Sequence, residues 1–101
     1  MALKSNISGT VVTSVLAAGD NVSKIQTIRL TNTHASTVAT VDLFIDSDSL
    51  GTFYIIKNVS IPVGVSLILN EGVSFDNSIN GYTLYTKLGA GTIDILINRK
   101  I

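Results

Sequence analysis

The side chains best suited to acid–base chemistry or to metal binding are few in this chain. Its 101 residues include one histidine, seven carboxylic acids and no cysteine. The histidine, His34, stands among Thr, Asn, Ala and Ser residues, where we expect a solvated loop side chain, because a general base or a metal ligand needs partners that this stretch does not supply. None of the many serines has the spacing of a nucleophile elbow. The sequence therefore predicts no catalytic residue and a protein that is not an enzyme.

Two acidic residues, Asp46 and Asp48, allow two interpretations. Their carboxylates suit a hard cation such as calcium, but the late glutamate of an EF-hand loop is absent. We favour the other interpretation, an Asx turn in which these side chains bond their own backbone. The segment Gly89-Ala90-Gly91 precedes an expected strand and no helix, so neither a helix dipole nor a nest of amides is available there to hold a phosphate. We expect neither a metal site nor a cofactor.

Two aromatic residues are candidates for contacts with another protein. Phe44 lies between Leu43 and Ile45, and Tyr54 follows Phe53, so neighbours in an extended strand point to opposite faces of the sheet. If Phe44 and Tyr54 point outward, they form a candidate interface, because buried aromatic rings supply much of the energy of protein binding. If loops cover both faces of the sheet, the same rings belong to the core.

The composition restricts the partners of this chain. Seven basic residues balance seven acidic ones, which leaves no long-range field to attract nucleic acid. No stretch approaches the 18 or so apolar residues of a membrane span, and the N-terminal residues lack an apolar run of secretory length, so we expect synthesis in the cytoplasm and no membrane partner. A net charge of zero combined with 46% hydrophobic residues favours a permanent protein partner, since charge repulsion usually keeps small domains apart.

The elements that position these residues are short runs rich in Val, Ile and Thr, which favour pleated strands. Turn residues separate the runs about every 8 to 12 positions, a spacing typical of a two-sheet sandwich. The sequence predicts one all-β domain over residues 1–101, an antiparallel β-sandwich with immunoglobulin-like or jelly-roll connections. Seven strands are expected, at residues 7–18, 23–32, 38–45, 52–59, 63–69, 82–88 and 92–101.

Three local features refine this prediction. The apolar positions Ile25 and Ile28 differ in parity, which predicts a bulge or a strand that is buried on both sides. Asn80-Gly81 suits a turn that needs positive φ. In the last strand, alternate apolar positions suggest an exposed edge that pairs with another chain. Its candidate interface residues are Ile93, Ile95 and Ile97, followed by Ile101.

Three segments of the chain resemble a known class of proteins. The resemblance spans residues 25–97 and rests on Ile28-Arg29-Leu30-Thr31-Asn32-Thr33, on Val41-Asp42-Leu43-Phe44-Ile45, and on residues 54–67, which end in Ile61-Pro62-Val63-Gly64-Val65-Ser66-Leu67. In these segments the chain resembles small β-sandwich virion structural proteins of tailed bacteriophages, particularly phages of marine and cyanobacterial hosts. The shared positions are strand and turn positions, so no functional residue carries over.

The resemblance implies a virion location and a non-enzymatic structural role, most readily that of a capsid decoration (cement) protein. We expect a symmetric homo-oligomer, with a trimer favoured, that binds other virion proteins such as the major capsid protein. A neck or tail accessory protein is the alternative within the same class. A host-attachment module is the alternative from another class, in which Tyr82 or Tyr85 stacks on surface carbohydrate.

Overall fold

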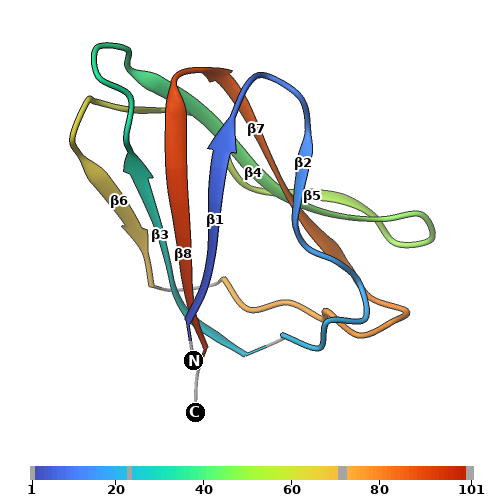
Figure 1. Ribbon diagram of the computed structural model, residues 1–101. Coiled ribbons are helices and arrows are strands. Elements are labelled where there is room, and N and C mark those ends of the chain that lie inside the picture. The colour runs from blue at the N-terminus through green and yellow to red at the C-terminus, as the bar shows by residue number, and fades with distance from the viewer. Residues whose placement is uncertain (1, 23, 71–72, 100–101) are drawn as a thin grey trace.

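The computed structural model describes residues 2–22, 24–70 and 73–99, which form eight strands and contain no helix, so no helix in these ranges could cross a membrane. The strands build two four-stranded antiparallel sheets that pack as a sandwich (Figure 1). The strands are β1 Ala2–Ser8, β2 Thr13–Leu16, β3 Ile25–Asn32, β4 Ala39–Ser47, β5 Gly51–Ile61, β6 Ser66–Leu69, β7 Thr83–Ala90 and β8 Thr92–Arg99. The predicted all-β sandwich is confirmed.

The strand order identifies the connections as those of a jelly roll. One sheet has the order β1-β8-β3-β6 and the other β2-β7-β4-β5, so every link except the β4–β5 hairpin crosses from one sheet to the other. The chain is arranged like one long hairpin wound around itself. In this hairpin β1 pairs with β8, β2 with β7, β3 with β6 and β4 with β5. An immunoglobulin-like order would instead place consecutive strands A and B in one sheet. The structure therefore selects the jelly-roll alternative.

The first predicted strand, at residues 7–18, is wrong in its extent. Gly9 adopts a φ of +83°, which a residue with a side chain rarely takes, and the chain reverses there between β1 and β2. Strand β1 begins as early as Ala2, in a polar stretch that shows no apolar alternation. Its register is set by pairing with β8, from Ala2 opposite Asn98 to Ser8 opposite Thr92. The described residues consequently form eight strands where seven were expected in the chain.

The core lies between the sheets and is filled from alternate strand positions, as the pleat requires. Val41 and Leu43 of β4 and Leu84 and Leu88 of β7 are fully buried, and so are Ile28 and Leu30 of β3. The parity change in β3 is a bulge, since the pairing of β3 with β8 shifts between Ile25 and Thr27. This confirms the first of the two interpretations of that strand.

The expectation that the last strand is a free edge is wrong. Strand β8 lies inside its sheet and pairs with β1 on one side and with β3 on the other. Ile93, Ile95 and Ile97 are at most 1% exposed and belong to the core, so their side chains have no surface to offer a partner. The alternation indicated correctly that these residues share one face, but that face is the inner one. Ile101 lies outside the described residues.

A second correction concerns residues 63–65, which alternate like a strand. They form a turn: Gly64 has a φ of +76°, and the Val65 amide donates to the Pro62 carbonyl over 3.1 Å. Strand β6 starts only at Ser66. The two valines of this turn are therefore exposed, at 43% and 44%.

Candidate interaction surfaces

Among the residues that the structure describes, one end of the sandwich carries no charged side chain. The turns β1–β2, β3–β4, β5–β6 and β7–β8 all lie at this end, which is uppermost in Figure 1. No Asp, Glu, Lys or Arg occurs in residues 5–19, 30–41, 58–70 or 88–93, the four segments that contain these turns. Five valines of these turns are between 43% and 76% exposed, and we call this surface the valine end: Val11, Val12, Val38, Val63 and Val65.

The loops of the valine end are held together by Asn32, which is buried. Its side-chain Nδ2 donates to the carbonyl oxygens of Thr37 and Ile61, each over 2.9 Å, and its Oδ1 accepts from the His34 amide. Its backbone exchanges hydrogen bonds with the turn at Gly64 and Val65. The β3–β4 and β5–β6 loops are thus tied to each other, so Val38, Val63 and Val65 stand on a fixed scaffold.

His34 has a structural role that the sequence did not suggest. Its ring Nδ1 accepts hydrogen bonds from the backbone amides of Ser36 and Thr37, over 3.1 and 3.0 Å. Nδ1 therefore acts as an acceptor that bridges two amides of its own loop. The side chain is half-buried and closes the β3–β4 loop, where a fully solvated residue was expected.

Phe44 and Tyr54 point away from the core, on the outer face of the β2-β7-β4-β5 sheet. The Phe44 ring lies 5.1 Å from the Tyr54 ring and 5.5 Å from the Tyr85 ring, measured between centroids, and the Lys57 ammonium lies 4.8 Å from the centre of the Tyr54 ring. We call Tyr85, Phe44 and Tyr54 the aromatic row. The structure therefore selects the outward orientation, in which the predicted interface pair joins a third ring from β7.

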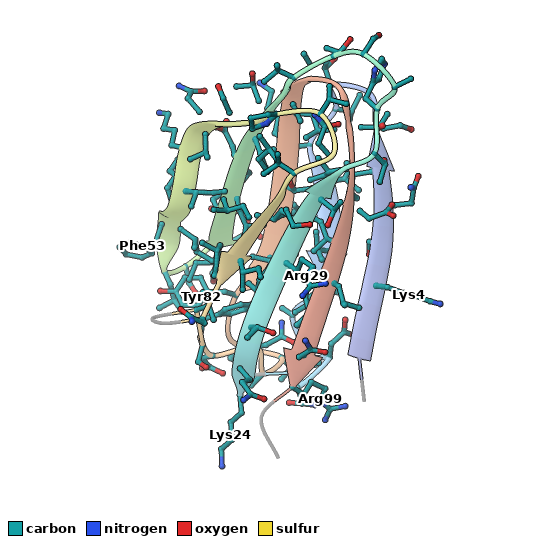
Figure 2. All side chains as sticks on the ribbon, turned by 90° about the vertical axis from the view of Figure 1, so that its left-hand side faces the viewer. Lys4, Lys24, Arg29, Phe53, Tyr82 and Arg99 are labelled. Atoms are coloured by element: carbon teal, nitrogen blue, oxygen red, sulfur yellow. The ribbon has the colours of Figure 1, made fainter. Side chains whose placement is uncertain are left out.

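Tyr82 and Tyr85 do not form one sugar-stacking face. The Tyr82 ring packs edge-on against Phe53, with centroids 6.0 Å apart, whereas Tyr85 stacks on Phe44. Phe53 and Tyr54 are neighbours in β5 and point to opposite sides, so the two pairs of rings lie on different sides of the sheet. Figure 2 shows Phe53 and Tyr82 together beside β5. Of the two tyrosines, only Tyr85 lies on the outer face.

The outer face of the other sheet is polar and basic. Hydrogen bonds link Asn6 to Asp94, Thr31 to Ser66 and Asn98 to Thr27 across its strands. Four of the seven basic residues surround this sheet, as Figure 2 shows: Lys4, Lys24, Arg29 and Arg99. Although the net charge of the chain is zero, its charges are not evenly distributed. Basic residues surround this sheet, and the valine end has no charged residue.

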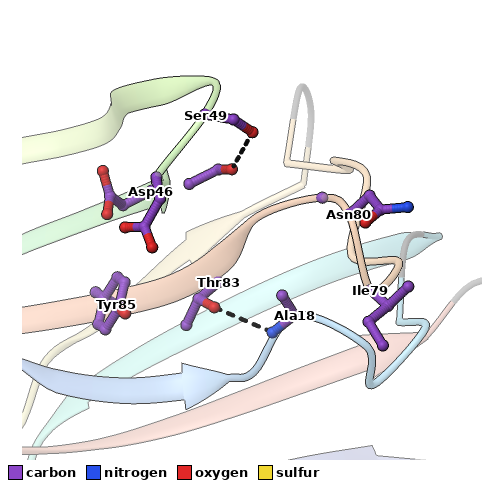
Figure 3. Close-up of a pocket in the computed structure, with 10 residues that line it drawn as sticks. Ala18, Asp46, Ser49, Ile79, Asn80, Thr83 and Tyr85 are labelled. Carbon is purple, nitrogen blue, oxygen red and sulfur yellow. Dashed lines mark hydrogen bonds between the residues drawn. The ribbon is translucent and has the colours of Figure 1, made fainter.

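A polar cavity of about 340 Å³ lies at the opposite end from the valine end, beside the aromatic row. Its walls come from the β4–β5 hairpin, from β7 and from the loop before β7 (Figure 3). Its lining residues are Ala18, Asp46, Ser47, Asp48, Ser49, Ile79, Asn80, Gly81, Thr83 and Tyr85. We call it the polar pocket. The acidic pair Asp46 and Asp48 lines it, and Tyr85 belongs to the pocket and to the aromatic row.

A second buried asparagine, Asn77, holds the loops at the pocket end. Its Nδ2 donates to the Ala17 and Tyr82 carbonyls over 3.0 and 2.8 Å, and its Oδ1 accepts from the Val22 amide. Its own carbonyl accepts from the amides of Gly19 and Asn21. A lone asparagine in a turn cluster gives no sequence signal of such a role, because four of its five partners lie in residues 17–22, far away in the chain.

The turn at Asn80-Gly81 is built differently from the expected one. Gly81 does not have positive φ, but a Cβ atom there would overlap the Asp76 carbonyl oxygen and lie 2.8 Å from the carbonyl carbon. Glycine is required for close approach of the backbone, and it lets the Tyr82 amide donate to that same carbonyl over 2.7 Å. In this turn the Ser78 hydroxyl and amide bond the Asp76 carboxylate and lower its pKa below the ordinary value of 3.8.

Within the described residues, no group of three or more His, Cys, Asp or Glu side chains is arranged to hold a metal ion. Asp46 accepts a hydrogen bond from the Thr52 hydroxyl across the β4–β5 hairpin. The acidic pair is therefore partly committed to the hairpin itself.

Comparison with known proteins yields no family. No protein-family model, no curated protein and no solved structure matches this chain. The structure shows a small all-β two-sheet sandwich, and a role in a phage virion is a proposal.

Proposed function

We propose that this protein is a non-enzymatic structural subunit that assembles with copies of itself through the valine end. The observation that carries the proposal is the coincidence of five exposed valines and no charged residue on a surface built from four separate turns. Exposed apolar side chains that gather on one uncharged surface are typical of sites of protein contact. The fixed loops keep the entropic cost of ordering the interface low.

The distribution of charge favours a second copy as the occupant of the valine end. When two uncharged surfaces meet, no charged group loses its water, and no like charges are brought together. Contact between two copies through the basic sheet face would oppose Arg29 and Lys4 of one copy to those of the other. Closed symmetry about an axis at the valine end, with three copies as the favoured number, buries the valines of every copy.

The larger assembly that we propose is a bacteriophage virion, in which the protein acts as a capsid decoration (cement) protein bound to the major capsid protein. Two facts support this step: the sequence resemblance of residues 25–97 to small virion proteins, and the jelly-roll fold, which capsid proteins share with lectins. The second is an analogy of fold, which by itself does not imply function. An oligomer also gains affinity for a capsid lattice through several simultaneous contacts.

The mass of the protein in solution tests the assembly. We expect the wild-type chain to be an oligomer by light scattering and Val11→Lys with Val65→Lys to be a folded monomer, since both side chains are already exposed. Leu50→Lys is the matched control: Leu50 is 48% exposed in the β4–β5 hairpin, away from the valine end, and the variant should remain oligomeric. A wild-type monomer at high concentration would refute self-assembly.

The proposed location has its own test. In purified particles of the phage that encodes the protein, quantitative mass spectrometry should find it in proportion to the major capsid protein. A few copies per particle would instead favour the neck or tail alternative, and absence from purified particles would refute a virion role.

A further inference from the structure

We propose that the polar pocket binds an uncharged saccharide, with the aromatic row extending the site for a second sugar ring. This inference does not depend on self-assembly, because the pocket and the valine end lie at opposite ends of the sandwich (Figures 1 and 3). The volume of about 340 Å³ lies at the small end of the range of ligand sites, roughly 300–1,000 Å³.

The charged residues that line the pocket indicate the class of ligand that it binds. Two carboxylates, Asp46 and Asp48, line the pocket, and among the described residues no Lys, Arg or His does. A phosphate or another anion would be repelled, whereas a ligand rich in hydroxyl groups supplies the donors that carboxylates accept. Asn80 adds both a donor and an acceptor on the opposite wall, and the Ser47 and Ser49 hydroxyls complete a mixed set. Such a lining fits a sugar, whose hydroxyls both donate and accept.

The apolar groups of the pocket suit the apolar faces of a sugar ring. Ile79 stands at the rim with 80% of its surface exposed, although nothing in the fold requires an isoleucine to face water there. Tyr85 presents its ring on the facing wall, below Asp46 (Figure 3). The C–H faces of a pyranose ring pack on such apolar groups while its hydroxyls reach the polar ones.

The pocket is held in shape without a ligand. The Thr83 hydroxyl accepts from the Ala18 amide over 3.0 Å, and the Gly81 amide donates to the Ser78 carbonyl over 2.9 Å. Asn77 anchors the loop that carries Ile79 and Asn80 to the β2–β3 segment. A rigid site of this kind loses little entropy when it binds.

The aromatic row continues the pocket along the sheet. Tyr85 lines the pocket and also stacks on Phe44, which contacts Tyr54. These rings extend the apolar surface beyond the pocket and can contact a second sugar ring, so the site should prefer an oligosaccharide to a monosaccharide.

Titration with neutral trisaccharides tests the proposal. Maltotriose, cellotriose, mannotriose and tri-N-acetylchitotriose are each added to the labelled protein, and backbone amide signals are followed by NMR. We expect at least one of them to shift signals of residues 46–49 and 79–85. Asn80→Ala and Asp48→Ala, both at exposed positions, should each weaken that binding by about fivefold or more, the effect of one lost hydrogen bond.

Asn70→Ala, at an exposed asparagine outside the pocket, is the matched control and should bind like the wild type. The titration is repeated in excess EDTA, and unchanged affinity supports direct binding of the sugar. No shift with any of the four sugars, shifts confined to other surfaces, or loss of binding in EDTA would each overturn the proposal. The oligomeric mass measured on the same samples keeps this result separate from the test of self-assembly.

Discussion

The side-chain amide of Asn32 donates to the carbonyl oxygen of Ile61 over 2.9 Å, joining the end of β3 in one sheet to the end of β5 in the other. Both residues are buried, at 2% and 1% exposure. Together with the bond from the same amide to Thr37, this contact fixes the loops on which the proposed assembly surface depends.

Replacing Asn32 should therefore be costly. Asn32→Ala leaves the buried Ile61 carbonyl, the partly buried Thr37 carbonyl and the His34 amide without their partner, and we expect the free energy of unfolding to fall by about 2–4 kcal/mol. Urea denaturation followed by circular dichroism measures the change. The exposed Asn70→Ala is the control and should alter stability by less than about 0.5 kcal/mol. Equal effects of the two variants would contradict the bridging role of Asn32.

The inner position of β8 can be tested with a pair of isoleucines. Ile95→Ala should destabilise the protein by about 2–5 kcal/mol, because it opens a cavity between the sheets. Ile68→Ala removes a side chain that is 50% exposed on the outer face of β6 and should cost clearly less, about 1 kcal/mol or below. Thermal unfolding of both variants provides the comparison. A small loss of stability in Ile95→Ala would contradict the placement of this β8 side chain in the core.

The close approach at Gly81 predicts that even one methyl group is too large. Gly81→Ala would place its Cβ against the Asp76 carbonyl, a backbone group that cannot yield without opening the turn. We expect a loss of about 2 kcal/mol or more in the free energy of unfolding, as for other substitutions that force strain into the backbone. Gly89→Ala, where the nearest atom would be a Thr40 side-chain carbon at 3.4 Å, is the matched control and should be tolerated.

The lowered pKa of Asp76 predicts that the folded protein loses a limited part of its stability in acid. The Ser78 hydroxyl and amide favour its charged form and lower its pKa from 3.8 in the folded protein. The folded state thus binds the proton less readily than the unfolded state. The stabilisation is present above pH 3.8 and is lost as the pH falls through the lowered pKa. Stability curves from about pH 6 to about pH 2 should show a smaller acid loss for Asp76→Asn than for the wild type, and an equal loss would refute this contribution.

The sequence predicts the fold class better than it predicts which strands lie at the edges of the sheets. Alternation in residues 93–97 identifies which side chains share a face, because the pleat is a local property. Whether that strand is central or at an edge depends on pairing with β1, which lies at the other end of the chain. Strand β1 itself was missed because its polar residues face solvent and take their extended form from β8.

The candidate surfaces were predictable only in part. Parity places Phe44 opposite to its neighbours and Tyr54 opposite to Phe53, but it left open which of them point outward, and the third ring, Tyr85, requires knowing that β7 pairs with β4. The valine end could not be seen in the sequence, since its five valines come from three loops that only the jelly-roll winding brings together. The long uncharged segments around those loops were the one available signal.

The central claim is that copies of the protein meet through the valine end, and cysteine cross-linking tests it most directly because the chain has no cysteine of its own. Single variants Val38→Cys and Leu50→Cys are treated with a short bismaleimide at the same concentration and separated under denaturing conditions. We predict covalent dimers for Val38→Cys and monomers for Leu50→Cys. Monomers for Val38→Cys, or equal cross-linking of both variants, would contradict assembly through this end of the sandwich.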